Sequence, residues 1–321
     1  MQNTTYTPPN TNLWAGRKTD PSNPPEYWFE VIKHLDISQP EQDWPAANFA
    51  LLGYACDEGV RRNQGRLGAV AGAGEVKRQC AKLANHLDNK VVADAGAITC
   101  TDENLEATQT AFGEAITRLL DQGIMPIGIG GGHDIAYAHF LGIDGYLSKF
   151  AGPKPRLGIL NFDAHFDLRP FPNGPTSGTP FRQVLADHSY YVEYMAVGIQ
   201  RAANVPSLFE TAANLNVDCI LHDACTPANI PSILHLLQSF FDRLDYLYIT
   251  VDLDGFSSAY APGVSAPSPV GFSPEFFFPI LRKILATGKV ISLDIAEMNP
   301  VFDQDGVTAK LAARIINEVT G

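Results

Sequence analysis

The chain has 321 residues, a length that α/β proteins often reach as a single domain, and 45% of them are hydrophobic, which is enough for one large core. Lys and Arg number 23 against 35 Asp and Glu, and the net charge of −12 argues against binding to nucleic acid or to an anionic membrane. No apolar run approaches the ~20 residues needed to cross a bilayer, and the N-terminus lacks the features of a signal peptide, so we expect a soluble, cytoplasmic protein.

The first 25 residues are rich in Pro, Asn and Thr, which indicates an arm on the surface of a single domain formed by residues 26–321. Trp14 and the Tyr27-Trp28-Phe29 cluster are expected to pin this arm. A strand is expected at 49–54, and the glycine-punctuated stretch 57–68 after it predicts a polar loop at the rim of a pocket.

Apolar strands and amphipathic helices then alternate to the C-terminus. Strands are predicted at residues 49–54, 91–95, 125–130, 156–163, 191–200, 217–221, 246–251 and 290–295. Helices are predicted at residues 75–87, 103–122, 135–149, 230–244, 274–286 and 308–319, with a helical turn at 181–187 and Asp102 as the cap of the second helix. This alternation, without an internal repeat or a break in composition, predicts an α/β fold with a doubly wound, mostly parallel sheet of about eight strands.

The cysteines indicate neither a disulfide framework nor a structural zinc site, because their number is odd and no Cys-x-x-Cys pair occurs. We expect buried free thiols at all five positions, which are Cys56, Cys80, Cys100, Cys219 and Cys225.

Three of the predicted strands lead into side chains that bind hard metal ions. Residues 161–167 are Asn-Phe-Asp-Ala-His-Phe-Asp, residues 252–254 are Asp-Leu-Asp, and the glycine-rich strand at 125–130 is followed by Gly-Gly-His-Asp. Alternate side chains of an extended backbone share a face, so the two Asp and the His of the first motif are expected to project to one side. Open α/β sheets place their sites at the carboxyl ends of the strands, where these residues lie.

If those strand ends converge, four carboxylates crowd together, and like charges would force some of them to take up protons. Two divalent cations would balance four negative charges and two neutral imidazoles. Such an oxygen-rich set without thiolates suits Mn²⁺, and two ions sharing a water would lower its pKa enough to supply hydroxide near neutral pH. The residues in question are His133, Asp163, His165, Asp167, Asp252 and Asp254.

Each of these residues taken alone is more often a turn former or a hydrogen-bonding group than a ligand, and only the combined pattern favours metal binding. The glycine run before His133 does not fit a phosphate loop, because neither G-x-G-x-x-G spacing nor a following G-K-[ST] is present. Glu297 ends the last strand, where the sequence is equally consistent with a structural role and with a place in the pocket.

Four motifs in order resemble the signatures of the ureohydrolases, the family that includes arginase, agmatinase and formiminoglutamase. They are Gly-Gly-Gly-His-Asp, Asn-Phe-Asp-Ala-His-Phe-Asp, Val-Asp-Leu-Asp and Ser-Leu-Asp-Ile-Ala-Glu-Met-Asn-Pro. The resemblance runs from about residue 49 to the C-terminus. It implies a three-layer αβα, arginase-like fold, a catalytic centre with two Mn²⁺ per subunit, hydrolysis of a C–N bond in a guanidino or imino group, and a homo-oligomer.

The resemblance also implies roles for single residues. One metal would be held by His133, Asp163, Asp167 and Asp252, and the other by Asp163, His165, Asp252 and Asp254. Asp167 would in addition hydrogen-bond the bridging hydroxide and pass its proton to the leaving nitrogen. Glu297 would bind the cationic amidine end of the substrate.

Departures from arginase indicate an acidic substrate. Arg169 stands where arginases have Asn, Gln200-Arg201-Ala202-Ala203 replaces the acidic residues that grip the substrate amine, and Phe181 replaces a proton-shuttle His. Guanidinium groups bind carboxylates, so Arg169 and Arg201 would hold the carboxylates of N-formimino-L-glutamate, with Ser177 or Thr179 hydrogen-bonding nearby. The alternative role of these two arginines is surface solvation.

In these positions the chain resembles the formiminoglutamase branch of the family. The resemblance implies that metal-bridging hydroxide attacks the formimino carbon and releases L-glutamate and formamide, a step of histidine breakdown. Two other functions stay open. Another ureohydrolase acting on an acidic guanidino compound would release urea, and a metal-binding regulator that has kept the fold would show no turnover.

Overall fold

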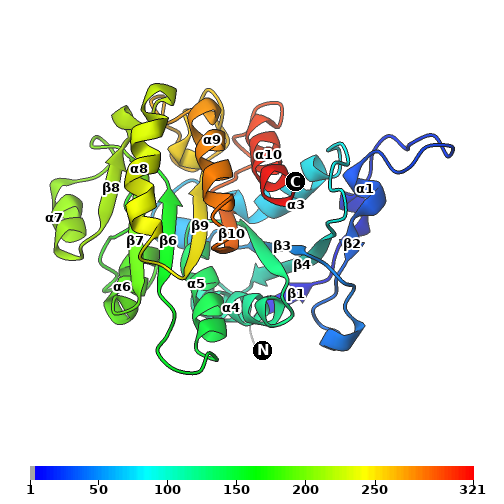
Figure 1. Ribbon diagram of the computed structural model, residues 1–321, viewed down its shortest axis with the longest axis horizontal. Helices are drawn as coiled ribbons and strands as arrows, with labels where there is room; N and C mark the ends of the chain where they lie inside the picture. Colours follow the sequence, from blue (N-terminus) through cyan, green and yellow to red (C-terminus); the bar gives the residue numbers. More distant parts are fainter. Residues whose placement is uncertain (1–3) are drawn as a thin grey trace.

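The computed structural model describes residues 4–321, so the first three residues of the predicted arm lie outside the described part. Ten strands occur in these residues: β1 Thr4–Thr7, β2 Lys33–His34, β3 Phe49–Ala55, β4 Val92–Cys100, β5 Met125–Gly130, β6 Leu157–Phe162, β7 Val192–Ile199, β8 Asp218–Leu221, β9 Tyr246–Asp252 and β10 Val290–Ala296. They form one sheet in the order β1-β4-β3-β5-β10-β9-β6-β7-β8, with β2 beside β4 (Figure 1). All neighbours are parallel except β1 and β4, so the predicted parallel α/β sheet is confirmed.

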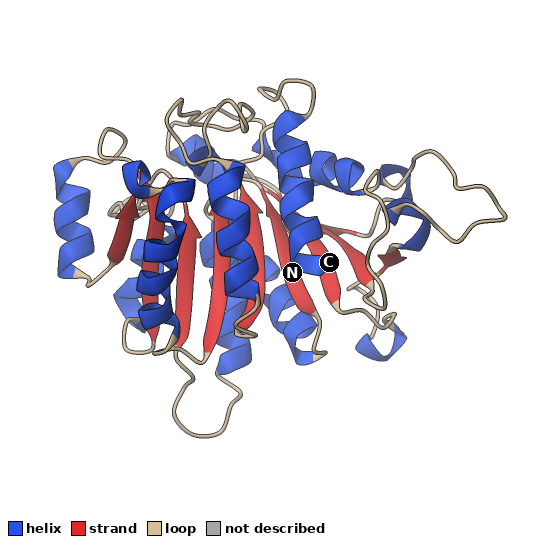
Figure 2. Ribbon diagram, turned by 45° about the horizontal axis from the view of Figure 1, so that its top comes forward, coloured by secondary structure: helices blue, strands red, loops and turns tan. Residues whose placement is uncertain are grey.

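Helices cover both faces of the sheet (Figure 2). The longer ones are α3 Gly72–Cys80, α4 Leu105–Asp121, α5 Ile135–Leu147, α6 Pro180–His188, α7 Pro206–Asn214, α8 Ile230–Phe241, α9 Pro274–Leu285 and α10 Val307–Thr320. Helices α3, α8, α9 and α10 pack into one apolar cluster, and α4, α5, α6 and α7 pack into another. Alternate residues of a strand enter different clusters: Tyr248 of β9 joins the second and Ile249 the first. The three-layer αβα arrangement is confirmed.

The central strands are buried on both faces, which explains their continuous apolar sequences. Every residue of β6 is buried, and β9 is buried from its second residue onward. Neither face of these strands contacts solvent. A polar side chain at the end of such a strand is therefore unlike the apolar residues before it and points to a functional role. The eight strands predicted from the sequence correspond to β3 to β10.

Two short helices and one longer one were not predicted. They are α1 Trp28–Val31, α2 Glu58–Arg62 and α7. Helix α2 lies in the stretch expected to be a polar loop, and that expectation is wrong there because Glu58 is buried and accepts hydrogen bonds from Arg61 and Arg62, which neutralise it.

Two helix boundaries also differ from the prediction. Helix α4 is capped by Asn104, whose side chain accepts from the Ala107 amide, and not by Asp102. Helix α3 ends at Cys80 instead of continuing to residue 87. The backbone beyond it pairs with the N-terminal segment, because the carbonyls of Ala81 and Leu83 accept from the amides of residues 29 and 28.

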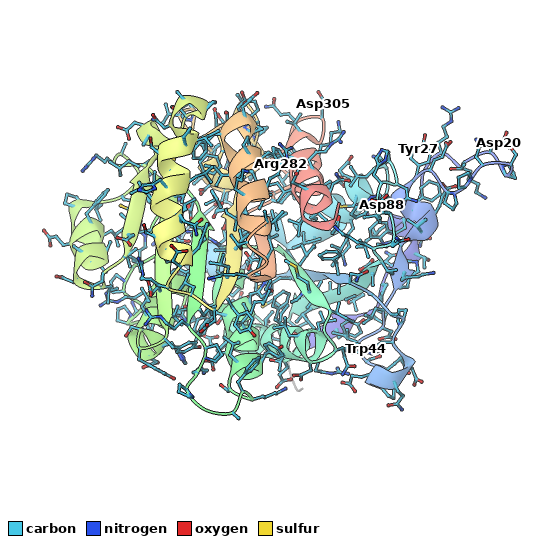
Figure 3. All side chains as sticks on the ribbon, viewed as in Figure 1. Asp20, Tyr27, Trp44, Asp88, Arg282 and Asp305 are labelled. Atoms are coloured by element: carbon cyan, nitrogen blue, oxygen red, sulfur yellow. The ribbon has the colours of Figure 1, made fainter. Side chains whose placement is uncertain are left out.

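The N-terminal segment adds β1 to the edge of the sheet and then forms a projecting loop. Trp14 is buried and its indole donates to Asp94 at 2.7 Å, whereas Asp20 lies at the tip of the projection (Figure 3). The division into an arm of residues 1–25 and a single domain of residues 26–321 stays a prediction.

All five cysteines are free, but the expectation of buried thiols is only partly met. Cys219 is exposed and Cys100 is half-buried, and the other three are buried. Among residues 4–321, no helix has both the length and the apolar character to cross a membrane.

Candidate metal centre

Four adjacent strands in the middle of the sheet carry the predicted site residues at their carboxyl ends. In sheet order these strands are β5, β10, β9 and β6. His133 follows β5, Glu297 follows β10, Asp252 ends β9, and Asp163 follows β6. Segments that are distant in sequence therefore meet at one edge, where the order of the strands departs from their order in the chain.

The same type of turn positions two pairs of ligand residues, Asp163 with His165 after β6 and Asp252 with Asp254 at the end of β9. Oδ1 of Asp163 accepts a hydrogen bond from the amide of His165 at 2.7 Å, and Oδ1 of Asp252 accepts from the amide of Asp254 at 2.8 Å. These turns, in which a carboxylate binds the backbone two residues on, keep the second residue of each pair on the side of the first.

One group of four side chains consists of His133 and three carboxylates around its ring. Its Nδ1 atom lies 2.9 Å from Oδ2 of Asp167, 3.1 Å from Oδ2 of Asp163 and 3.2 Å from Oδ2 of Asp252. Each of the four residues offers one ligand atom, and these atoms lie within 4.8 Å of one another. This set matches the four residues expected to share one ion.

A second group contains Asp163, His165 and Asp254, again with ligand atoms within 4.8 Å of one another. Nδ1 of His165 lies 3.1 Å from Oδ2 of Asp254 and 3.5 Å from Oδ1 of Asp163. Asp163 thus turns one oxygen to each group. Asp252 falls in the first group, and its bridging role stays a prediction.

The buried carboxylates of this cluster repel one another unless cations or protons balance their charge. Burial, together with the neighbouring carboxylates, raises the pKa of Asp252 to about 7. Burial likewise raises the pKa of Asp254 to about 6, and burial with the charge of Asp163 raises the pKa of Asp167 to about 6. Oδ1 of Asp254 is buried and has no hydrogen-bond partner among residues 4–321. The donor set therefore fits two divalent ions, which would hold these carboxylates in their charged form.

A buried hydrogen-bond network supports His133 from behind. Its Nε2 lies 2.9 Å from the hydroxyl of Thr250, and that hydroxyl donates to Oδ1 of Asp294 at 2.6 Å. Because the Thr250 proton is given to Asp294, the Thr250 oxygen accepts from Nε2–H of His133. Nδ1 is then the ring nitrogen that faces the carboxylates, and its lone pair would be available to a metal ion bound among them.

Glu297 lies beside the first group with one oxygen engaged. Its Oε1 accepts from the His133 amide at 3.0 Å, whereas Oε2 is buried and has no partner among the described residues. Burial and the charges of Asp252 and Asp254 raise the pKa of Glu297 well above its usual range. Glu297 and Asp167 both have positive φ angles, 66° and 50°, a conformation that is uncommon for non-glycine residues.

These groups open into a cavity of about 330 Å³. Arg169 and Ser177 line it together with five of the ligands and Glu297. Thr179 and Arg201 do not line it. Thr179 is buried and hydrogen-bonds within its own turn, and the exposed Arg201 places its guanidinium 5.3 Å from the ring of Phe209. Their roles stay predictions.

Several lining residues were not anticipated, among them Asn63 and Arg66. Both lie in the stretch 57–68, whose predicted place at the rim of a pocket is confirmed. The signal for it was a polar segment directly after a strand. Phe181, at the position of the arginase shuttle His, is buried; its ring stacks on Tyr194 with centroids 4.3 Å apart and meets His133 edge-on at 5.5 Å. This position cannot carry a proton.

The fold and the site together define an α/β protein with a binuclear metal centre at the carboxyl edge of its sheet. The model of the arginase family matches residues 47–321. Curated formimidoylglutamases from Geobacillus thermodenitrificans and Legionella pneumophila are 44% and 40% identical to the chain, over 98% of it and over 96% and 97% of their own lengths. The chain belongs to the arginase family, and the predicted resemblance is confirmed.

Solved structures agree on the fold. The formimidoylglutamase of Bacillus subtilis has a TM-score of 0.78 at 22% identity, with 87% of each chain covered. A Trypanosoma cruzi formiminoglutamase with Mn²⁺ has a TM-score of 0.74 at 24% identity, covering 88% of this chain and 94% of that one.

Proposed function

We propose that this chain hydrolyses N-formimino-L-glutamate to L-glutamate and formamide, with two Mn²⁺ per subunit. It is a hydrolase that acts on C–N bonds, as expected from full-length relatives that bear the name formimidoylglutamase. The observation that carries the choice of substrate is the charge pattern of one cavity. An acidic end contains the ligand groups and Glu297, and Arg169 lines the same cavity without an ion pair among the described residues. N-formimino-L-glutamate has the complementary pattern, a cationic amidine and two carboxylates.

Two divalent ions bound by the ligand groups would lower the pKa of a shared water and so supply hydroxide near neutral pH. Glu297 hydrogen-bonds the amidine N–H groups through its unpartnered Oε2, which orients the formimino carbon towards the ligand groups. Asp167 accepts the proton of the attacking hydroxide as the carbonyl of formamide forms and transfers it to the amine nitrogen of glutamate as the C–N bond breaks. The carbon keeps the new oxygen and one nitrogen and leaves as formamide.

Arg169 and Ser177 bind a substrate carboxylate. Both line the cavity, which favours them over Thr179 and Arg201 for this role. Arg201→Ala is accordingly a control for Arg169→Ala, since each substitution removes one exposed guanidinium.

The proposed function is tested by assaying formamide and urea release together with metal content. Formamide from N-formimino-L-glutamate, with two Mn²⁺ per chain, is the expected result. Urea from an acidic guanidino compound, with no formamide, would assign a different reaction, and no turnover in fully loaded protein would favour a regulator. Arg169→Ala should raise KM about 10-fold or more, because charged hydrogen bonds to the substrate are lost, and Arg201→Ala should not.

We also propose a homo-oligomer in the cytoplasm. Family membership supports the oligomer, and light scattering of the metal-loaded protein across a range of concentrations tests it. A strictly monomeric mass would contradict it.

A further inference from the structure

Two residues on the cavity wall are anchored to the same backbone atom. Asn63 follows helix α2 and its amide donates to the carbonyl of Gly59 at 3.0 Å. The amide of Ser177, which is 114 positions further along the chain, donates to the same carbonyl at 3.1 Å. Both residues line the cavity. Their relative position is therefore fixed by the helix end and not by either side chain.

Their side chains are also joined, and the direction of the bond is informative. Nδ2 of Asn63 donates to Oγ of Ser177 at 3.2 Å. An amide N–H can only donate, so the hydroxyl of Ser177 is the acceptor. Ser177 is only 7% exposed, and no acceptor for its own proton occurs among residues 4–321. The Ser177 O–H is thus left to donate into the cavity.

Arg169 is packed against the same turn. Its amide donates to the carbonyl of Gly178 at 3.0 Å. A Cβ atom at Gly178 would lie 3.0 Å from Cδ of Arg169 and 3.3 Å from the amide group of Asn63, so both side chains pack closely against the turn. One short turn therefore gathers an amide, a hydroxyl and a guanidinium on one part of the wall. All three are hydrogen-bond donors, which suits a carboxylate.

We propose that Asn63 positions the Ser177 hydroxyl so that its proton points at a substrate carboxylate bound by Arg169, and that it thereby sets the preference of the cavity for acidic amidines. This inference rests on the proposed function. Asn63 acts through Ser177 and is a positioning residue. The competing explanation is that Asn63 only ends helix α2, in which case its side-chain amide would have no effect on substrate choice.

Asn63→Asp perturbs this contact directly, because a carboxylate at this position accepts the Ser177 proton, turns it away from the substrate and adds a negative charge to the cavity wall. We expect KM for N-formimino-L-glutamate to rise about 10-fold or more with kcat changed by less than about 3-fold. Asn173→Asp is the matched control: the residue is exposed, lies in the same loop as Arg169 and does not line the cavity, so KM should stay unchanged.

A double-mutant cycle tests whether Asn63 acts through Ser177. Asn63→Ala should raise KM in the wild type but add nothing in the Ser177→Ala background, whereas additive losses would overturn the inference.

Substrate analogues test which carboxylate of the substrate the Ser177 hydroxyl contacts. N-formimino-4-aminobutyrate lacks the α-carboxylate and N-formimino-L-2-aminobutyrate lacks the side-chain carboxylate. The Asn63→Asp effect should vanish with one of them, and its persistence with both would contradict a carboxylate contact.

Calorimetric binding of N-formimino-L-glutamate to the manganese-loaded variants separates this inference from the proposed function. If the wild type released no formamide, the proposed function would fail, yet the ratio of affinities between wild type, Asn63→Asp and Asn173→Asp would still decide the role of Asn63. Asn63 is exposed, so its variants are expected to fold, and an unchanged manganese content checks this.

Discussion

At the scale of single residues, the hydroxyl of Thr250 decides which ring nitrogen of His133 faces the ligand group. Thr250 is fully buried between the imidazole and Asp294, and Tyr248 donates to the other oxygen of Asp294. With its proton committed to Asp294, Thr250 can only accept from the imidazole. Such outer hydrogen bonds fix the tautomer and raise the basicity of a ligating imidazole.

Thr250→Val keeps the size of the side chain but removes this acceptor. We expect Mn²⁺ affinity to fall about 10–100-fold, because Nε2–H of His133 is left unpaired in a buried position and the tautomer with a free Nδ1 lone pair loses its support. Dialysis against graded manganese concentrations with metal analysis measures the affinity, and ¹⁵N shifts of the His133 ring report the tautomer. The exposed Thr110→Val serves as control. An unchanged affinity would remove Thr250 from this role.

The six candidate ligands could be predicted from the sequence, because alternation along a strand and the position of sites at strand ends are local rules. Asn63 and Thr250 could not. Each matters through a partner more than 110 positions away, Ser177 for one and His133 for the other, and neither lies in a pattern of its own. Arg201 shows the converse: its residue type suggested a carboxylate site, but the turn after β7 leaves it outside the cavity.

At the scale of elements, Asp94 joins three segments. It accepts from the indole of Trp14 in the N-terminal segment and lies 2.5 Å from Nζ of Lys77 on α3, and both charged side chains are at most 3% exposed. Lys77 also donates to the carbonyl of Gly96 at 2.7 Å. The pair is therefore fully hydrogen-bonded inside the protein, and removing one partner leaves a buried charge.

Lys77→Met should lower the free energy of unfolding by about 3–5 kcal/mol, because Asp94 loses its cation in a buried site. The double variant Lys77→Met/Asp94→Asn should recover part of this loss, since no charge is then left unpaired. Urea unfolding followed by circular dichroism measures both. Lys82→Met, on an exposed position just beyond α3, should stay within about 0.5 kcal/mol of the wild type. A Lys77→Met protein as stable as this control would contradict the argument.

The projecting N-terminal loop depends on one carboxylate. Glu30 accepts hydrogen bonds from the amide and hydroxyl of Thr19 and from the amides of Glu26 and Tyr27. The Thr19 hydrogen bonds lower the pKa of Glu30. Because the pKa of Glu30 is lower in the folded than in the unfolded state, its ionised carboxylate stabilises the folded loop. This stabilisation is fully present above the unfolded pKa of about 4.3 and is lost as the pH falls through the folded pKa.

Glu30→Gln should therefore loosen the loop at neutral pH, seen as faster proteolytic cleavage between residues 17 and 27. In the wild type, the NMR shift of the Thr19 amide should titrate with a midpoint below the ordinary pKa of a glutamate side chain. A midpoint at the ordinary glutamate value, or equal cleavage of both proteins, would show that the carboxylate does not hold the loop.

Local patterns predicted the regular elements more reliably than the short ones. Strands β3 to β10 were found because each is an apolar run between turn signals. Helix α2 was missed because its single turn carries Glu58, Arg61 and Arg62, whose polarity suggests a loop until their mutual pairing is known. Strands β1 and β2 were missed because pairing with the far strand β4, and not their own composition, makes them strands.

At the scale of the whole molecule, the topology of the sheet determines how much charge one edge must accommodate. Because β5, β10, β9 and β6 are neighbours, their ends place Asp167, Asp252, Asp254 and Glu297 on the wall of one cavity. Parallel neighbours could be predicted from the alternation of strands and helices, but the order in which they lie could not. The sequence therefore supported the convergence of the ligands only as a hypothesis, because it did not reveal the order of the strands in the sheet.

Manganese removal should change both the stability of the protein and its dependence on pH. Burial raises the pKa of Asp252 to about 7 and of Asp254 to about 6, so the metal-free protein binds more protons than the unfolded chain between about pH 4 and pH 7. Its stability should fall as the pH rises through that range. Manganese displaces these protons, so the loaded protein should lack this fall and gain about 4 kcal/mol at a concentration 1,000-fold above Kd. Calorimetric melting temperatures of chelated and loaded protein measure the difference, which should widen from about pH 5.5 to about pH 8. A difference that stays constant or narrows would mean that protons and metal ions do not compete for these carboxylates.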